Sequence, residues 1–170
     1  MKTSFDECAE AQPLRDQLWM NRGEVEFWRL LQECDSRVRL QPAATKQPIA
    51  QLRRYAGGTL PDTLEEFLRH SNGLFFDADA IVFPTDRIIR ETEKMRQEEG
   101  CMPIDHLLFI GALGDGDMFA FGKAKSGEWL RDVFWWEHET DSRYSCGFLI
   151  WGYVAAHVSW RHPMKHGPAV

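Results

Sequence analysis

The sequence predicts a single domain that contains both helices and β-strands. Its 170 residues lie within the usual size of one domain, and 44% hydrophobic with 27% charged residues is a globular composition. The segment 62–71 has the amphipathic spacing of a helix. The segments 107–113 and 118–122 are apolar and are joined by a short glycine-rich stretch, as in a β-hairpin.

Two helices are predicted in the first part of the chain, at 14–34 and from about residue 49 to residue 56. Gly23 weakens the middle of the first helix. A connector with two prolines, residues 39–48, separates the two helices, and Gly57-Gly58 ends the second. The apolar stripe of the first helix consists of Leu14, Leu18, Val25, Trp28 and Leu31.

Two further helices are predicted at 62–71 and 86–99. The first carries a buried stripe of Leu64, Phe67 and Leu68, and Asn72-Gly73 ends it because both residues tolerate a left-handed backbone. The second is capped by Thr85 or Asp86 and ends at Gly100. Its narrow apolar stripe predicts a helix on the outside of the fold.

Strands are predicted at 74–78, 80–83, 107–113, 118–122 and 133–136. The turn Gly114-Asp115-Gly116-Asp117 joins the third and fourth of these strands into a hairpin. The apolar segment 148–157 is compatible with either a helix or a strand, because its periodicity favours neither.

The charge balance disfavours nucleic acid as a partner. The net charge is −6, and the acidity lies in residues 59–170, which hold eleven basic and eighteen acidic residues. No apolar run is long enough to span a bilayer, and the start MKTSFDECAEAQP lacks the apolar stretch of a signal peptide. We therefore expect a cytoplasmic protein without a membrane partner. Its scattered cysteines are expected to be inert: Cys8, Cys34, Cys101 and Cys146.

Two acidic motifs allow more than one interpretation. Asp115 and Asp117 could hold a hard cation, but a soluble hairpin turn explains them better. The stretch Glu137-His138-Glu139-Thr140-Asp141 is not a zinc-protease motif, because Ser142 stands where a second histidine is needed. It fits a solvated strand end, and also a protein-binding acidic patch.

The remaining residues predict no catalytic machinery. Near the C-terminus, His157, His162 and His166 cannot share one helix face because Pro163 interrupts the helix. No phosphate-binding loop, nucleophile elbow or dinucleotide fingerprint is present in the sequence. We therefore predict no catalytic residue, no cofactor and no metal ion, and expect the protein not to be an enzyme.

Three segments in order carry a family likeness. RLQPAATKQPIAQLRRYAGGTLPDTLEEFLRHSNGL resembles the opening of the SUKH superfamily, which includes the SMI/KNR-type cell-wall assembly regulators. LLFIGALGDGDMFAFG and DVFWWEHETD are similar to its glycine-and-aspartate hairpin and its tryptophan-containing strand end. The resemblance covers residues 40–155, with a helical extension at 1–39 and a tail at 156–170. It implies an α+β domain with a twisted, mostly antiparallel sheet flanked by helices.

The resemblance also implies a function. Many bacterial members are immunity proteins that neutralise a toxin, frequently a nuclease, whereas eukaryotic members are regulators or interaction scaffolds. We expect a non-enzymatic inhibitor, monomeric or homodimeric, that binds a cognate toxin with a basic active-site face. The alternatives are a regulatory scaffold and a metal-binding enzyme that uses the two acidic motifs. The expected interaction surface consists of Asp115, Asp117, Trp136, Glu137, Glu139 and Asp141. Either Trp135 or Trp136 is the candidate anchor for the partner, and the alternative is that the sheet is covered on both faces and both tryptophans are buried.

Overall fold

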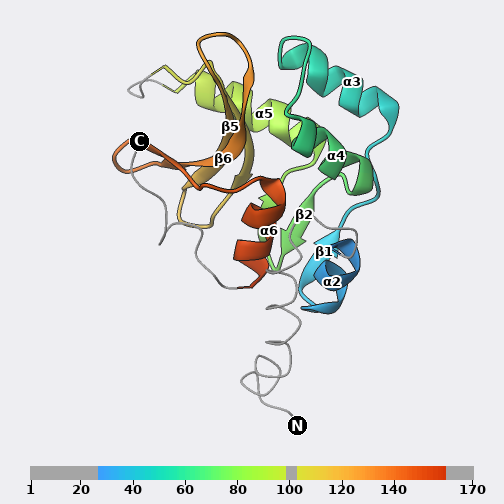
Figure 1. Cartoon of the computed structure of the whole chain (residues 1–170). Helices are drawn as coiled ribbons and strands as arrows, with labels where there is room; N and C mark the ends of the chain where they lie inside the picture. Colours follow the sequence, from blue (N-terminus) through green and yellow to red (C-terminus); the bar gives the residue numbers. More distant parts are fainter. Residues whose placement is uncertain (1–26, 99–102, 160–170) are drawn as a thin grey trace.

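The computed structural model describes residues 27–98 and 103–159, which form an α+β domain of two antiparallel sheets flanked by helices (Figure 1). This confirms the fold class expected from the sequence. The helices are α2 (Phe27–Glu33), α3 (Lys46–Tyr55), α4 (Asp62–His70), α5 (Thr85–Arg96) and α6 (Ile150–Val158). The strands are β1 (Val38–Leu40), β2 (Leu74–Phe76), β3 (Asp79–Val82), β4 (Leu107–Ala112), β5 (Met118–Lys123), β6 (Trp129–Glu137) and β7 (Ser142–Ser145).

Each sheet follows the order of its strands along the chain. The first sheet has the order β1-β2-β3 and the second the order β4-β5-β6-β7, with every pairing antiparallel. The predicted hairpin around residues 114–117 is therefore confirmed as β4–β5. The strand predicted at 133–136 is the second half of a longer strand, β6, which begins at Trp129.

The helices α4 and α5 agree with the predicted segments. The stripe Leu64, Phe67 and Leu68 of α4 is fully buried. Helix α5 begins at Thr85, but neither Thr85 nor Asp86 caps it with its side chain, which corrects the predicted cap. Asn72 supplies a capping contact instead, because its side-chain oxygen accepts a hydrogen bond of 2.9 Å from the Thr85 amide.

Other elements differ from the prediction. Helix α3 begins at Lys46, inside the segment expected to be a connector, and it accommodates Pro48 because an amide in the first helical turn needs no partner in the helix. The connector also contains the end of β1, which the sequence did not reveal. Of the predicted helix 14–34, only α2 lies within the described residues, and His162, His166 and Gly100 lie outside them.

Helix α6 resolves the ambiguous segment 148–157. Every residue of α6 except His157 is buried, so the helix is apolar on all sides and has no amphipathic period. In Figure 1, α6 (red) lies at the front between the two sheets. Tyr153 on α6 contacts both sheets, since its ring packs on Phe119 of β5 and its hydroxyl donates a hydrogen bond to the Ile81 carbonyl of β3.

Residues on both sides of the expected domain limits belong to one core. On α2, Phe27, Leu30 and Leu31 are buried in the same cluster as α4 and α6. The Phe27 ring meets Trp151 of α6 at 5.3 Å between centroids. The expected limit at residue 40 falls at the end of β1, and the limit at 155 falls within α6. In the described part of the chain, no helix is long and apolar enough to cross a membrane.

The two sheets meet at a glycine. A Cβ atom at Gly111 of β4 would overlap the Ile81 carbonyl oxygen and stand 2.7 Å from the Tyr153 hydroxyl. The register of β4 and β5 shifts between Phe109 and Gly111, and the carbonyl of the intervening Ile110 accepts a 2.6 Å hydrogen bond from the Phe83 amide. A bulge and a missing side chain therefore bring the two backbones into contact.

We expect Gly111→Ala to destabilise the domain by about 3 kcal/mol or more, because the new methyl group meets backbone that cannot move without separating the sheets.

Tyr153→Phe leaves the Ile81 carbonyl without its donor and is expected to cost about 1–3 kcal/mol. Denaturant unfolding of the purified variants measures both free energies.

Gly122→Ala is the matched control for Gly111→Ala. A Cβ atom at this β5 glycine would meet Leu107, Leu130 and Phe134 only at 3.6–3.7 Å, which is ordinary van der Waals contact. Its free energy of unfolding should stay within about 1 kcal/mol of the wild type. Equal losses for the two alanine variants would contradict the close approach at Gly111.

Candidate functional site

The two acidic motifs lie at the same end of the four-stranded sheet. The β4–β5 turn contains Asp115, and the β6–β7 turn contains residues 138–141. Because consecutive antiparallel strands reverse direction, the first and third turns of the order β4-β5-β6-β7 lie at one end. We call the region formed by residues 114–117 and 137–141 the acidic end.

Asp117 joins the two turns. It is 8% exposed, and its carboxylate accepts hydrogen bonds from the Trp135 indole at 2.9 Å and from the His138 amide at 3.0 Å. The same oxygen that accepts the His138 amide lies 2.7 Å from the His138 Nδ1 atom. Asp117 is therefore a buried acceptor that fixes the acidic end, and its carboxylate already has partners within the protein.

The β4–β5 turn is shaped by its own residues. An Asp115 carboxylate oxygen accepts a 3.1 Å hydrogen bond from the Asp117 amide, which is the local bond typical of an aspartate in a turn. Gly116 has φ +104°, and a Cβ atom there would lie 3.3 Å from the His138 ring. The turn interpretation of this motif therefore accounts for both its aspartates and for Gly116.

A second tryptophan–aspartate pair comes from the next residue of β6 and the β6–β7 turn. The Trp136 indole donates a 2.5 Å hydrogen bond to the Asp141 carboxylate, which also receives one from Arg143 at 3.2 Å. Trp136 is only 5% exposed, so the structure corrects its expected role as an exposed anchor. Its neighbour Trp135 is half-buried and packs against Tyr144 of β7, with 5.2 Å between ring centroids.

Three of the expected carboxylates point to solvent in different degrees. Asp115 and Glu139 are exposed, and Glu137 is partly exposed, with its carboxylate accepting a hydrogen bond from the Thr140 hydroxyl. The six residues expected at the interaction surface thus divide into two groups. Asp117, Trp136 and Asp141 build the frame, whereas Asp115, Glu137 and Glu139 carry negative charge on its outside.

The His138–Asp117 contact shifts the pKa of both groups. Burial acts to raise the pKa of Asp117, but hydrogen bonds from His138 and Trp135 outweigh it and the net shift is downward. The hydrogen bond to Asp117 raises the pKa of His138, and the charges of Asp117, Glu139 and Asp115 add to the rise against a smaller effect of desolvation. Between these two pKa values the contact is an ion pair.

Neither a metal-binding cluster nor a nucleophilic thiol is found in the part of the chain that the structure describes. Among the described residues, no three His, Cys, Asp or Glu side chains are grouped so that they could hold a metal ion. The described cysteines, Cys34 and Cys146, are buried. Burial, with the Asp132 charge second, raises the pKa of the Cys146 thiol to about 12, so the thiol is inert near neutral pH.

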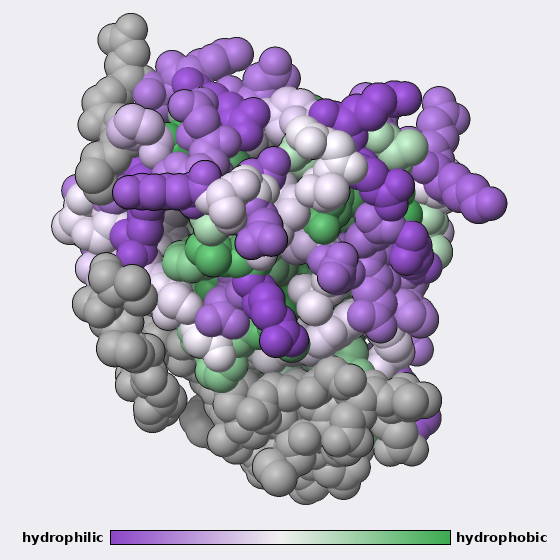
Figure 2. Space-filling view, turned by 45° about the horizontal axis from the view of Figure 1, so that its top comes forward, coloured by the Kyte–Doolittle hydropathy of each residue, from purple (hydrophilic) through white to green (hydrophobic). Residues whose placement is uncertain are grey.

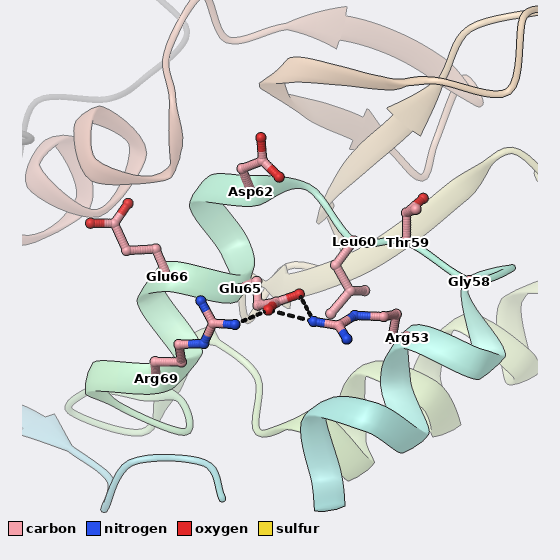
Figure 3. Close-up of a pocket in the computed structure, with 8 residues that line it drawn as sticks. All are labelled: Arg53, Gly58, Thr59, Leu60, Asp62, Glu65, Glu66 and Arg69. Carbon is pink, nitrogen blue, oxygen red and sulfur yellow. Dashed lines mark hydrogen bonds and ion pairs between the residues drawn. The ribbon is translucent and has the colours of Figure 1, made fainter. Parts of the chain in front are cut away.

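A hollow of about 630 Å³ lies between α3 and α4, away from the acidic end (Figure 3). Glu65 lies at its centre and accepts hydrogen bonds from Arg53 of α3, at 2.6 and 2.7 Å, and from Arg69 of α4. Asp62 and Glu66 point away from this ion cluster in Figure 3. The cluster connects two helices, so we interpret it as structural.

The sheet end opposite the acidic end contacts the α3–α4 connection. Lys123, at the end of β5, donates a 2.6 Å hydrogen bond to the Ala56 carbonyl, and the Trp129 indole donates one of 3.1 Å to the Thr59 carbonyl. Figure 2 turns the top of the molecule forward and shows a surface that is mostly hydrophilic, with small apolar areas between the polar side chains. The exposed carboxylates of the acidic end and the α3–α4 connection therefore lie at opposite ends of β5.

The fold and the acidic end define an α+β domain whose charged turns are held by partly buried hydrogen bonds. Sequence comparison identifies its family, since residues 43–151 match the SMI1 / KNR4 family (SUKH-1). The match covers more than half of the chain, and the chain belongs to this family. The matched segment begins after β1 and ends within α6. A search among curated proteins finds no match.

Sequence reasoning missed the role of His138. Strand alternation places its side chain opposite Glu137 and Glu139, which argued against a shared site within the motif itself. Its partner comes from another turn, and the sequence signal was the second Asp of the GDGD motif, which the hairpin register places near the end of β6. From the sequence, Asp117 can be placed near the end of β6 only once β5 is known to pair with β6.

The ion pair predicts a pH-dependent cost for Asp117→Asn. A raised His138 pKa gives a stabilisation that is complete below the unfolded-state pKa of about 6.5 and is lost as the pH rises through the folded-state value. Because the pKa of Asp117 is lowered, its own contribution is lost only in acid. The loss of unfolding free energy in Asp117→Asn should therefore be larger near pH 5.5 than near pH 8.5.

Asp115→Asn is the comparison variant: asparagine can accept the same hydrogen bond from the Asp117 amide, and only the Asp115 charge, the smallest contribution to the raised pKa of His138, is lost, so its pH dependence should be the smaller. Denaturant unfolding of both variants at the two pH values provides the comparison. A cost of Asp117→Asn that does not change with pH would show that Asp117 does not raise the pKa of His138 in the folded protein.

Proposed function

We propose that this protein is a non-enzymatic immunity protein that binds a toxin domain and blocks its working face. Membership of the SMI1 / KNR4 family supports the proposal, because the family is generally one of immunity and regulatory proteins without enzymatic activity. The observation that carries the choice of surface is the acidic end, where exposed carboxylates stand on a frame fixed by Asp117 and Asp141.

The charge of the acidic end favours a basic partner. Asp115, Glu137 and Glu139 contribute three negative charges, while the positive charges of Arg143 and of protonated His138 lie beside Asp141 and Asp117. A nuclease attracts the phosphates of its substrate with a basic face, so a nuclease domain is the partner we propose. Opposite charges accelerate the encounter of such a pair and disfavour wrong partners.

Trp135 is the proposed aromatic contact beside these charges. It is half-buried, its indole is held by Asp117, and its ring packs on Tyr144 of the edge strand β7. An aromatic side chain that is already held in one orientation loses little conformational freedom on binding. Tight binding requires such an apolar centre in addition to charge, over about 800 Å² on each partner.

Charge reversal tests the surface. The triple variant Asp115→Lys, Glu137→Lys, Glu139→Lys should associate at least about tenfold more slowly, at low ionic strength, with a toxin domain whose growth arrest the intact chain relieves. The salt dependence of its association rate should also be flatter than that of the wild type. Stopped-flow or surface-based kinetics at several salt concentrations measure both effects. Asp117 and Asp141 stay unchanged because their loss would disturb the frame.

The control for this variant carries the same change in net charge elsewhere. Glu66 of α4, Glu93 of α5 and Glu128 of the β5–β6 turn are exposed, and all three are replaced by lysine. This control separates a local effect of the acidic end from an effect of total charge. Equal association rates for the two triple variants would contradict the proposed surface.

Growth rescue tests the function itself. Co-expression of the intact chain with the C-terminal domain of a toxin encoded beside it should restore growth of the host cell, and the acidic-end triple variant should restore it less. Colony counts over a range of toxin induction give the readout, and the amount of soluble protein is compared in parallel. Growth arrest that the intact chain does not relieve would favour the regulatory scaffold over the immunity protein.

A further inference from the structure

We propose that His138 controls the charge of the acidic end through its protonation while holding the two turns together in both protonation states. The inference rests on the proposed function, because it concerns how the acidic end meets a basic partner. It assigns to His138 a role that is distinct from the frame residues and from the exposed carboxylates.

The two nitrogen atoms of the imidazole have different roles: Nδ1 bonds to Asp117, and Nε2 carries the proton that titrates. Its Nδ1 atom lies 2.7 Å from the Asp117 carboxylate, and the backbone amide of the same residue bonds the same oxygen at 3.0 Å. The ring also lies over Gly116, where any Cβ atom would stand 3.3 Å from it. A neutral imidazole with its hydrogen on Nδ1 keeps the bond to Asp117, so the proton that titrates is the one on Nε2.

The charged groups that act on the ring come from both turns. Asp117 contacts its Nδ1 atom from the β4–β5 turn, Asp115 lies in the same turn, and Glu139 follows His138 in the β6–β7 turn. The hydrogen bond to Asp117 and the charges of these carboxylates raise the pKa of His138 above its ordinary value of about 6.5. The side chain is 39% exposed, so a charge on it is presented to a bound partner.

The sign of the effect follows from this arrangement. Protonated His138 offsets one carboxylate and repels the lysine or arginine side chains of a basic partner, whereas neutral His138 does neither. Binding of such a partner should therefore tighten as the pH rises through the pKa of His138. The repulsion between two like unit charges about 7 Å apart in water weakens binding by about threefold before salt screens it. We therefore expect the affinity for a basic partner to change by about this factor.

The test uses the full chain and an oligolysine peptide as the basic probe. Proton NMR of the imidazole follows the pKa of His138 in the wild type, and saturating peptide should lower this pKa. The affinity of the peptide, measured from chemical-shift changes at the acidic end, should rise about threefold between about pH 6 and about pH 8.5. In His138→Asn, whose amide nitrogen can replace Nδ1 as the donor to Asp117, the affinity should lose this dependence.

His70→Asn is the matched control, since His70 is exposed on α4 and lies outside the acidic end. It should keep the pH dependence of the wild type. A His138 pKa that does not move on peptide binding, or a pH dependence that persists in His138→Asn, would overturn the proposal and leave the acidic surface intact. If the peptide does not bind the acidic end at any pH, both this proposal and the basic-partner assignment fail.

Discussion

The two sheets of this domain touch backbone to backbone at Gly111, and this contact depends on the absence of a side chain at that position. The bulge before Gly111 turns the Ile110 carbonyl toward Phe83, and Tyr153 satisfies the Ile81 carbonyl from α6. Three elements distant in sequence are thereby fixed at one point. Burial raises the pKa of Tyr153 well above its usual range, which favours the protonated hydroxyl that donates to the Ile81 carbonyl.

This junction determines where the acidic end lies. It fixes β4 against β3, and β5, β6 and β7 extend away from β4 as successive hairpins. The acidic end therefore lies on the β4–β5 and β6–β7 turns, while Lys123 and Trp129 attach the opposite end of the sheet to the α3–α4 connection. The position of the charged turns follows from core contacts, and their rigidity follows from Asp117.

The sequence predicted elements that carry a strong local signal. Helix α4 has an apolar stripe between turn residues, and the β4–β5 hairpin has two apolar strands around the GDGD turn. It left α6 undecided because a helix that is buried on all sides lacks an amphipathic period. It missed β7, whose sequence SRYS has no apolar alternation and becomes a strand only by pairing with β6.

The site was predictable only in part, for a related reason. The sequence identified the acidic residues but could not separate Asp115 from Asp117, which stand two positions apart and differ in burial. Likewise, alternation along β6 predicts that Trp135 and Trp136 face opposite sides of the sheet, but not which side is covered. Which side is covered depends on how α5 and α6 pack on the sheet. It also depends on the hydrogen bonds of the two indoles, Trp135 to Asp117 and Trp136 to Asp141.

The division between the frame carboxylates, Asp117 and Asp141, and the outer carboxylates explains how an acidic surface can be rigid. Several carboxylates close together repel one another, and a flexible turn would respond by spreading them apart. Here two of the five are removed from this repulsion, because Asp117 receives donors from Trp135 and His138 and Asp141 receives donors from Trp136 and Arg143. Each exposed carboxylate then stands on a turn whose conformation is fixed before a partner arrives. Such preorganisation leaves more of the electrostatic attraction available for binding, and it makes the frame residues as important to the surface as the charges themselves.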